Sequence, residues 1–376
     1  MQRATSPWQR RRADELHHAG KQPVKVASGS RAVATAAELA LCACLLGTGS
    51  SALGAGPTPA PVGLPASGIA GSAEARQWLQ RIHQAASQRN YQGTLVVTAN
   101  GSMSSSRLAH YGEGNHTFER IDLLDGQPRR IYRHNEQVLI VWPTAKLARF
   151  EQRDSVALFP AVLSGSEDEL FERYEMLAEG TDRVAGHDAR VFLLRPRDTL
   201  RFAQRLWAEQ ATGLLLRADV LNADGRVLET AAFTEVSVGI KSQPETVLLP
   251  MKRLDGYRIV RAAPQRTALE AQGWQMKSAV PGFRQVSCVL RNLEAGADPA
   301  PAGPVHDVLQ AIFSDGLTHV SVFIEPYRAD RHRPGMTAVG ATHTLMQAVG
   351  AHWLTVVGDA PMATLKQFPA LLERSR

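Results

Sequence analysis

The sequence predicts an α+β protein whose larger part is an antiparallel β-sheet of consecutive hairpins, followed by a smaller second domain. The chain has 376 residues, which is enough for two separate cores. Short apolar segments with a period of two dominate much of the chain after residue 90. The dipeptide Asp-Gly occurs between such segments at 125–126, 224–225 and 315–316, where it predicts hairpins with type I′ turns.

Residues 1–54 have the composition of a signal peptide with a basic extension. They hold seven Lys/Arg against three Asp/Glu, and the apolar run at 32–46 is too short to span a membrane. Cleavage is expected near Ala52-Leu53-Gly54-Ala55. Two alternatives stay open, a disordered basic tail followed by a buried helix and a lipoprotein signal at Leu41–Cys44.

The net charge of +6 does not indicate nucleic-acid binding, because residues 1–54 carry about +4 of it and the remainder has no Lys/Arg block resembling a phosphate-binding stripe. Cys42 and Cys44 lie in the segment expected to be removed. Cys288 then remains alone, so no intramolecular disulfide is expected. Its apolar, strand-like setting predicts a buried, inert thiol.

The first domain is expected at 73–238, after a flexible lead at 55–72. Its first element is an amphipathic helix at Ala73–Gln88 with Trp78, Leu79 and Ile82 on one face. A capping box at Ser166–Glu169 predicts a second helix from Glu167 to Ala178. The strands are expected at 93–100, 107–112, 117–124, 129–133, 137–142, 146–152, 189–194, 214–221 and 227–238.

Residues 239–250 read as a linker, and 251–376 as the second domain. The alternation at Leu317–Glu325 predicts a strand that leaves the Asp315-Gly316 turn. After it we expect a helix at His343–Val349, a strand at Trp353–Val357 and a terminal helix at Met362–Leu372 that Pro369 disturbs. Residues 294–304 are expected to form a surface loop.

No pattern in the sequence indicates a reaction centre, a cofactor or a metal. The P-loop, Gly-x-Ser-x-Gly, Cys-x-x-Cys and His-Glu-x-x-His motifs are absent from the expected mature chain. The neighbours His187 and Asp188 would point to opposite faces of a strand, which is unsuited to a proton relay. A non-enzymatic protein that acts by binding is therefore expected. We expect no catalytic residues, no cofactor and no metal ligands.

Several ordered blocks resemble the MucB/RseB family of periplasmic regulators. The longest are Arg205–Leu216 and Ser314–Pro326. Others are Tyr91–Leu95, Leu124–Arg130, Phe159–Leu163, Asp182–His187, Pro196–Asp198, Pro281–Phe283, Gly340–Thr342 and Thr355–Asp359. The resemblance covers roughly residues 91 to 364, and the basic N-terminal extension departs from it.

The resemblance implies a first domain similar to the LolA/LolB lipoprotein carriers, a half-open β-barrel with helices, and a smaller α/β second domain. It implies a periplasmic protein that binds the periplasmic part of a single-span anti-sigma factor similar to RseA or MucA, shields it from regulated proteolysis, and releases it when a lipid or lipopolysaccharide-type signal binds. Whether the protein forms a homo-oligomer is left open. A lipid or lipoprotein carrier of LolA/LolB type is the alternative, and an unrecognised enzyme comes third.

Two sets of site residues follow. An apolar cavity is expected to be lined by inward side chains, although the pattern leaves open which face of the sheet is the inner one. The cavity candidates are Leu95, Val97, Val138, Ile140, Trp142, Trp207, Leu214 and Leu216. Partner contacts are expected on two loops of the second domain, although Asp315-Gly316 could equally be only a turn. The partner candidates are Ser314, Asp315, Gly316, Glu325, Tyr327 and Arg328.

Overall fold

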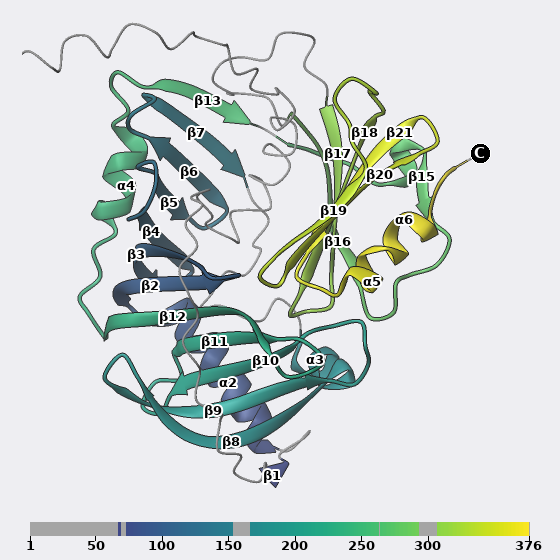
Figure 1. Ribbon diagram of the computed structural model, residues 1–376. Helices are drawn as coiled ribbons and strands as arrows, with labels where there is room; N and C mark the ends of the chain where they lie inside the picture. Colours follow the sequence, from purple (N-terminus) through teal and green to yellow (C-terminus); the bar gives the residue numbers. More distant parts are fainter. Residues whose placement is uncertain (1–66, 69–72, 153–165, 263, 293–306, 376) are drawn as a thin grey trace, which may run out of the picture.

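The computed structural model describes residues 67–68, 73–152, 166–262, 264–292 and 307–375. Within these ranges the chain is mostly β and forms two large sheets that lie side by side (Figure 1). The expected signal peptide, the lead apart from residues 67–68, the block Phe159–Leu163 and the loop at 294–304 lie outside the described residues.

The first sheet has thirteen strands in the order β1-β8-β9-β10-β11-β12-β2-β3-β4-β5-β6-β7-β13. Neighbours are antiparallel except β13, which runs parallel to β7. The two ends of this order do not pair with each other, so the described sheet is not a closed barrel. The strands are β1 (Ser67–Gly68), β2 (Tyr91–Ala99), β3 (Ser102–Glu113), β4 (His116–Leu123), β5 (Arg130–His134), β6 (Gln137–Trp142), β7 (Leu147–Gln152), β8 (Tyr174–Val184), β9 (His187–Pro196), β10 (Ala203–Glu209), β11 (Leu215–Leu221), β12 (Val227–Val238) and β13 (Arg258–Ala262).

The second sheet has seven antiparallel strands in the order β14-β16-β17-β18-β21-β20-β19, and a separate two-stranded ribbon joins β15 to β22. The strands are β14 (Gln265–Arg266), β15 (Trp274–Met276), β16 (Arg284–Asn292), β17 (Asp307–Ser314), β18 (His319–Pro326), β19 (Gly335–Val339), β20 (Thr342–Val349), β21 (His352–Gly358) and β22 (Leu372–Arg374).

Helices are few and pack against the sheets. They are α2 (Ala73–Gln88), α3 (Glu167–Arg173), α4 (Glu245–Lys252), α5 (Met362–Leu365), α6 (Gln367–Leu371) and a 3-10 turn at Glu270–Gln272. Helix α2 has the expected bounds and buries Leu79 and Ile82, with Trp78 packed against the same cluster. Met251 and Val247 of α4 join Leu139 and Phe150 in another cluster on one face of the first sheet.

Two expected helices are corrected by the structure. Residues 343–349 form most of strand β20, which pairs with both β19 and β21. The helix expected at 167–178 ends at Arg173, and Tyr174 begins β8. Both segments contain good helix formers, but pairing with neighbouring strands outweighs local propensity. The second domain is therefore an antiparallel sheet with two short helices rather than an α/β unit.

The three Asp-Gly dipeptides at 125–126, 224–225 and 315–316 join antiparallel neighbours, as expected. Their turn type was predicted incorrectly, because only the glycine of each pair has a positive φ, whereas a type I′ turn requires it at both central residues. The Asp side chains instead accept hydrogen bonds. Asp125 Oδ2 accepts from the backbone N–H of Ser105, and Asp315 Oδ1 accepts from those of Leu317 and Thr318.

Residues 239–250, expected to be a linker, include most of helix α4, and the chain then returns to the first sheet as β13. The terminal helix is divided at Lys366 into α5 and α6, and Pro369 lies inside α6. Ser166 Oγ accepts from the Glu169 N–H, which is the expected half of the capping box, whereas the Glu169 carboxylate binds Arg284. That contact already joins the two parts of the chain.

Candidate binding site

The strand register places five of the cavity candidates on one face of the first sheet. Leu95 pairs with Ser106, and Ile121, Ile131 and Ile140 pair in sequence across β4, β5 and β6. Directly paired residues share a face, as do residues two apart on one strand. Leu95, Val97, Val138, Ile140 and Trp142 therefore lie on the same side, opposite the face covered by α4.

Four candidates belong to one core cluster. Leu95 packs with residues of β10 and β11, and Val97 lies against the cluster while remaining partly exposed. Val138 and Ile140 are each 4% exposed, whereas Trp142 is half-buried. The cluster members among the candidates are Leu95, Trp207, Leu214 and Leu216. The structure thus packs these four side chains together in a buried core, whereas Val138, Ile140 and Trp142 lie outside that cluster. Their role in holding a ligand stays a prediction.

Polar groups interrupt this apolar face. Ser104 Oγ and Arg149 Nε are buried and have no hydrogen-bond partner among the described residues. The Arg149 guanidinium lies over the Trp142 ring, 5.5 Å from its centroid, and 3.5 Å from the Glu151 carboxylate. The face is therefore amphipathic, with aliphatic side chains beside a cation.

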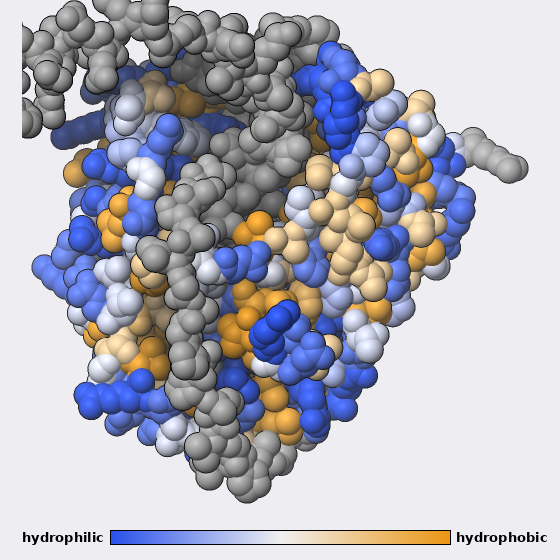
Figure 2. Space-filling view, in the orientation of Figure 1, coloured by the Kyte–Doolittle hydropathy of each residue, from blue (hydrophilic) through white to orange (hydrophobic). Residues whose placement is uncertain are grey.

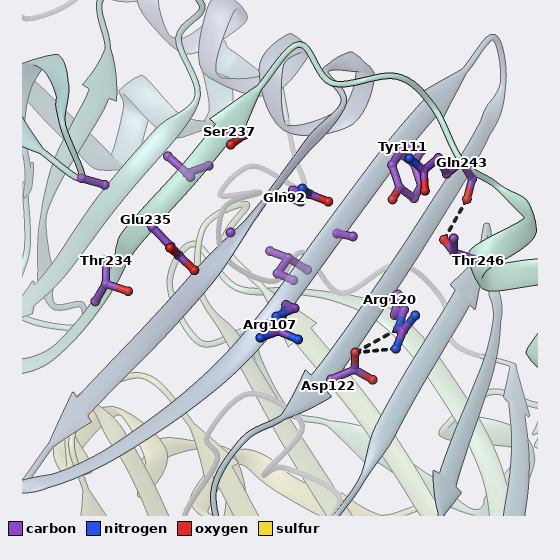
Figure 3. Close-up of a pocket in the computed structure, with 15 residues that line it drawn as sticks. Gln92, Arg107, Tyr111, Arg120, Asp122, Thr234, Glu235, Ser237, Gln243 and Thr246 are labelled. Atoms are coloured by element: carbon purple, nitrogen blue, oxygen red, sulfur yellow. Dashed lines mark hydrogen bonds and ion pairs between the residues drawn. The ribbon is translucent and has the colours of Figure 1, made fainter.

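A different hollow, of about 500 Å³, opens on the opposite face of the sheet (Figure 3). Arg107, Arg120 and Asp122 line it from β3 and β4, and Gln243 and Thr246 close it from the segment around the start of α4. None of the eight cavity candidates lines this hollow. The sequence patterns did not indicate this hollow, because the cavity candidates were chosen at apolar positions, whereas its walls are mostly polar.

The pocket contains an acceptor that is not satisfied. Arg120 Nε donates to Asp122 Oδ2 at 2.9 Å. Asp122 Oδ1 is buried, lacks a hydrogen bond within the described chain, and has Arg130 Nε at 3.6 Å. The pocket also lies beside the bulge where β12 shifts register between Phe233 and Glu235. Bulges of this kind commonly re-aim side chains near binding sites.

The turn at 314–318 lies between the two domains rather than on an exposed loop. Asp315 is 2% exposed, and its Oδ2 accepts from Arg201 Nε at 2.6 Å and from the Tyr174 hydroxyl at 2.9 Å. Arg201 also donates to the backbone oxygen of Pro281 at 2.8 Å, and Leu317 packs in the core of the first domain. We call this group of contacts the seam.

Burial and charge act together at the seam. Burial alone would lower the pKa of Arg201, but Asp315 and then Asp198 raise it, so the guanidinium keeps its charge. Burial, reinforced by Asp315, raises the pKa of Tyr174 well above its usual value, so its hydroxyl remains a donor. Ser314 and Asp315, two of the partner candidates, are both buried, and Asp315 is held by side chains of the first domain.

More contacts extend the seam. Asn100 donates to the Ala338 oxygen, and Thr364 donates to the Leu200 oxygen. Phe202 meets the His343 ring edge-on at 5.6 Å. In the space-filling view, apolar residues gather around the junction of the two sheets, interspersed with hydrophilic ones (Figure 2). The two sheets are therefore held together by packing as well as by the ion pair.

Gly316 is buried in the same turn as Asp315, and Glu325 lies near the end of β18. The other partner candidates, Tyr327 and Arg328, lie on the loop after β18. The Tyr327 side chain is 40% exposed, and its ring lies 6.0 Å from that of Trp353. The Arg328 guanidinium lies 3.4 Å from the Asp330 carboxylate. His332, stacked on Trp353 at 4.7 Å, accepts from the Arg328 backbone N–H and so holds the loop in shape. The loop therefore presents Tyr327 on a fixed support.

The described residues contain no group of three or more His, Cys, Asp or Glu side chains arranged to hold a metal. His187 bonds to the Glu209 carboxylate at 2.6 Å and to the Val236 oxygen at 3.1 Å, which makes it a link between strands. Cys288 is a buried free thiol whose pKa burial raises to about 11, as expected of an inert cysteine. Among the described helices, none is long and apolar enough to cross a membrane.

Comparisons with known proteins agree on one family. Residues 74–251 match the model of the MucB/RseB N-terminal domain, and residues 268–373 match that of the MucB/RseB C-terminal domain. The sigma factor AlgU regulatory protein MucB of Pseudomonas aeruginosa is 28% identical over 308 residues, covering 79% of this chain and 90% of the relative. The sigma-E factor regulatory protein RseB of Haemophilus influenzae is 24% identical over 294 residues, covering 78% and 89%.

Solved structures show the same similarity. The MucA/MucB complex of Pseudomonas aeruginosa contains a chain that matches with a TM-score of 0.61 and 26% identity, covering 81% of this chain and all of that one. A crystal structure of MucB in complex with periplasmic MucA gives a TM-score of 0.60 at 25% identity, covering 80% and 99%. Because both domain models match in order along the chain, and because the fold of both sheets is shared with MucB, the chain belongs to the MucB/RseB family.

Proposed function

We propose that this protein is a periplasmic negative regulator of a sigma-E-type extracytoplasmic stress response. It binds the periplasmic domain of a membrane anti-sigma factor, shields that domain from regulated proteolysis, and releases it when a lipid-type signal binds. The observation that carries the proposal is the match of both domains to a MucB chain solved together with MucA. The expected domains, 73–238 and 251–376, would act as one binding unit held by the seam.

The apolar face of the first sheet is the proposed lipid site. Curvature supports a half-open barrel of the LolA/LolB kind, because the start of β9 bends onto β12, where His187 meets the Val236 oxygen. Aliphatic side chains around Ile140 would contact acyl chains, and the nearby Arg149 would face a polar headgroup. The other candidates, Leu95, Val97, Val138, Trp142, Trp207, Leu214 and Leu216, would extend this surface.

A charge on this face tests the lipid site. Ile131 pairs with Ile140 and is only half-buried, so Ile131→Asp should reduce binding of a fluorescent fatty acid with less risk to folding than Ile140→Asp. Met103→Asp, which alters a side chain 70% exposed at the end of the β2–β3 hairpin, is the matched control. Equal binding by the folded Ile131 variant and the control would remove this face from the proposal.

The partner site is proposed at Glu325, near the end of β18, and on the following loop with Tyr327 and Arg328. Ser314, Asp315 and Gly316 act indirectly by holding the seam. An exposed tyrosine beside an arginine is typical of side chains that dominate interface energies. Its fixed support, the His332–Trp353 stack, lowers the entropy lost on binding.

The direct test uses the purified chain and the purified periplasmic segment of the anti-sigma factor encoded in the same genome. We expect a stable complex in size-exclusion chromatography and slower cleavage of the segment by the protease that normally degrades it. Failure of the folded chain to bind or protect the segment would contradict the proposal. Recovery of many lipoproteins from a membrane extract, without the anti-sigma factor, would instead identify a carrier.

A further inference from the structure

Two histidines on neighbouring strands face each other at one end of the β4–β5 hairpin, far in sequence from the seam. His116 begins β4 and His134 ends β5, and His116 Nδ1 lies 3.2 Å from His134 Nε2. The ring centroids are 5.3 Å apart. His116 is exposed and His134 is half-buried, so solvent reaches the pair.

The surrounding residues fix both rings. His134 stacks on Phe118, its directly paired neighbour, with centroids 4.7 Å apart and an interplanar angle of 8°. His116 lies 6.1 Å from the same phenyl ring. Asn135, at φ 53°, accepts from the Thr117 N–H at 2.9 Å and donates to the Thr117 oxygen at 3.0 Å, which pins the turn beside the rings. The rings are therefore positioned before any ligand arrives.

The spacing of the facing nitrogens suits a tetrahedral cation. With zinc–nitrogen bonds of about 2.0–2.1 Å, two ligands of a tetrahedral Zn²⁺ lie about 3.3 Å apart. The observed 3.2 Å matches this spacing. A hydrogen bond between these two nitrogens requires a proton on one of them, and a bound cation would take the place of that proton.

We propose that His116 and His134 form a surface site for a borderline transition-metal ion such as Zn²⁺, with the remaining coordination positions occupied by water. No third His, Cys, Asp or Glu in the described part of the chain completes the group, so the site is open and exchangeable rather than a closed structural centre. Imidazole pairs favour Zn²⁺ and Cu²⁺ over Mg²⁺ and Ca²⁺, which prefer oxygen ligands. Bound metal would fasten the end of β4 to that of β5.

Calorimetric titration of the untagged full chain with ZnCl₂ tests the site. We expect one Zn²⁺ per chain to bind in a step that His116→Gln and His134→Gln each weaken by about tenfold or more. The control His83→Gln changes an exposed histidine on α2, and should leave that step unchanged. Excess Mg²⁺ should not compete.

A measurement on the unaltered protein guards against misfolded variants. Zn²⁺ should shift the imidazole proton resonances of His116 and His134 in the wild-type NMR spectrum before those of the other histidines. Unshifted resonances of this pair, or Zn²⁺ affinity that stays the same in both folded Gln variants, would overturn the proposal. Neither outcome depends on binding of the anti-sigma segment, so the regulatory proposal is tested separately.

Discussion

At the scale of single residues, Asp315 joins the two domains more directly than any other side chain described above. Its side chain is completely buried, as is that of Arg201, and it accepts from Arg201, Tyr174 and two backbone amides of its own turn. A buried carboxylate with this many donors is well satisfied, whereas loss of its charge would leave Arg201 poorly compensated. The seam therefore depends on a matched pair.

We predict that Asp315→Asn lowers the free energy of unfolding by about 3 kcal/mol or more, because Arg201 then keeps only the partly exposed Asp198 as a charged partner. Urea denaturation followed by circular dichroism measures the change. Asp224→Asn, in the exposed β11–β12 turn, is the matched control and should have little effect. A similarly small effect for Asp315→Asn would show that the seam depends on packing alone.

A buried histidine predicts how stability varies with pH. Burial lowers the pKa of His110 from 6.5, and Arg133 lowers it further. The Glu119 carboxylate and the hydrogen bond with the Arg89 backbone oxygen oppose this shift without reversing it. As pH falls through 6.5, the unfolded chain takes up a proton that the folded chain resists. The free energy of unfolding should therefore decrease on acidification between about pH 7.5 and 5.5, and recover as pH rises.

Urea denaturation across that pH range tests the role of His110. His110→Gln should reduce the dependence on pH, whatever its effect on stability at neutral pH. His83→Gln, with its exposed side chain, should preserve the dependence. An identical pH profile in the wild type and the His110 variant would exclude His110 as the cause.

At the scale of elements, helix α2 approaches β3 too closely for any side chain at Gly112. A Cβ there would lie 2.8 Å from the Ser87 backbone oxygen and 3.0 Å from the Gln88 Cα. Backbone atoms cannot move aside as a flexible side chain can, so the glycine permits the helix to dock. The docking of α2 is thus specified by the strand as well as by the apolar face of the helix.

Gly112→Ala should therefore lower the free energy of unfolding by about 1–3 kcal/mol. Urea denaturation would show this as a lower midpoint concentration, with an unchanged dependence of the unfolding free energy on urea concentration. The matched control is Gly335→Ala in β19, where a Cβ would meet only the Met346 methyl carbon at 3.8 Å. Equal stability of the two variants would contradict the close approach of α2.

The loop after β18 is the element proposed to bind the partner. Tyr327→Ala should weaken binding of the anti-sigma segment by about 2 kcal/mol, because an exposed aromatic side chain on a fixed loop is a typical interface anchor. Fluorescence anisotropy of the labelled segment measures it. Val286→Ala removes another exposed apolar side chain, 47% exposed on β16, and should leave binding unchanged. The loop would be ruled out if both variants bound as the wild type does.

Sequence patterns predicted elements where one face is buried and turn residues mark both ends. The bounds of Gln137–Trp142, Val227–Val238 and Ala73–Gln88 were correct to the residue. Strands β8 and β20 were missed because Tyr174–Ala178 and His343–Val349 contain helix formers and owe their conformation to strands distant in sequence. Only long-range pairing distinguishes such segments from helices.

At the scale of the whole molecule, the residues that join the two domains could not be predicted. Arg201 and Asp315 are separated by more than a hundred residues, and neither shows a local pattern that reveals its partner. The family resemblance did predict the two-domain organisation, and matches to both domain models confirm the family. Only the strand register showed that five cavity candidates share one face of the sheet, namely Leu95, Val97, Val138, Ile140 and Trp142. The alternation of apolar and polar residues in the sequence does not fix that register, and a shift of one residue would turn every side chain to the other face.

Because the seam joins the proposed lipid face and the proposed partner loop in one body, two ligands can affect each other's binding. If each ligand favours a different arrangement of the domains, each weakens the other by the same factor. This reciprocity separates a regulator from a carrier, which would bind lipid without any effect on an anti-sigma factor.

The most direct measurement is therefore the dissociation constant of the labelled anti-sigma segment, determined with and without a saturating amphiphilic lipid, for the wild type and Ile131→Asp. We predict that lipid weakens segment binding to the wild type by about 5- to 150-fold, and that the Ile131 variant binds the segment but loses most of the lipid effect. Segment binding that is unchanged by lipid, under conditions where lipid is shown to be bound, would contradict the account.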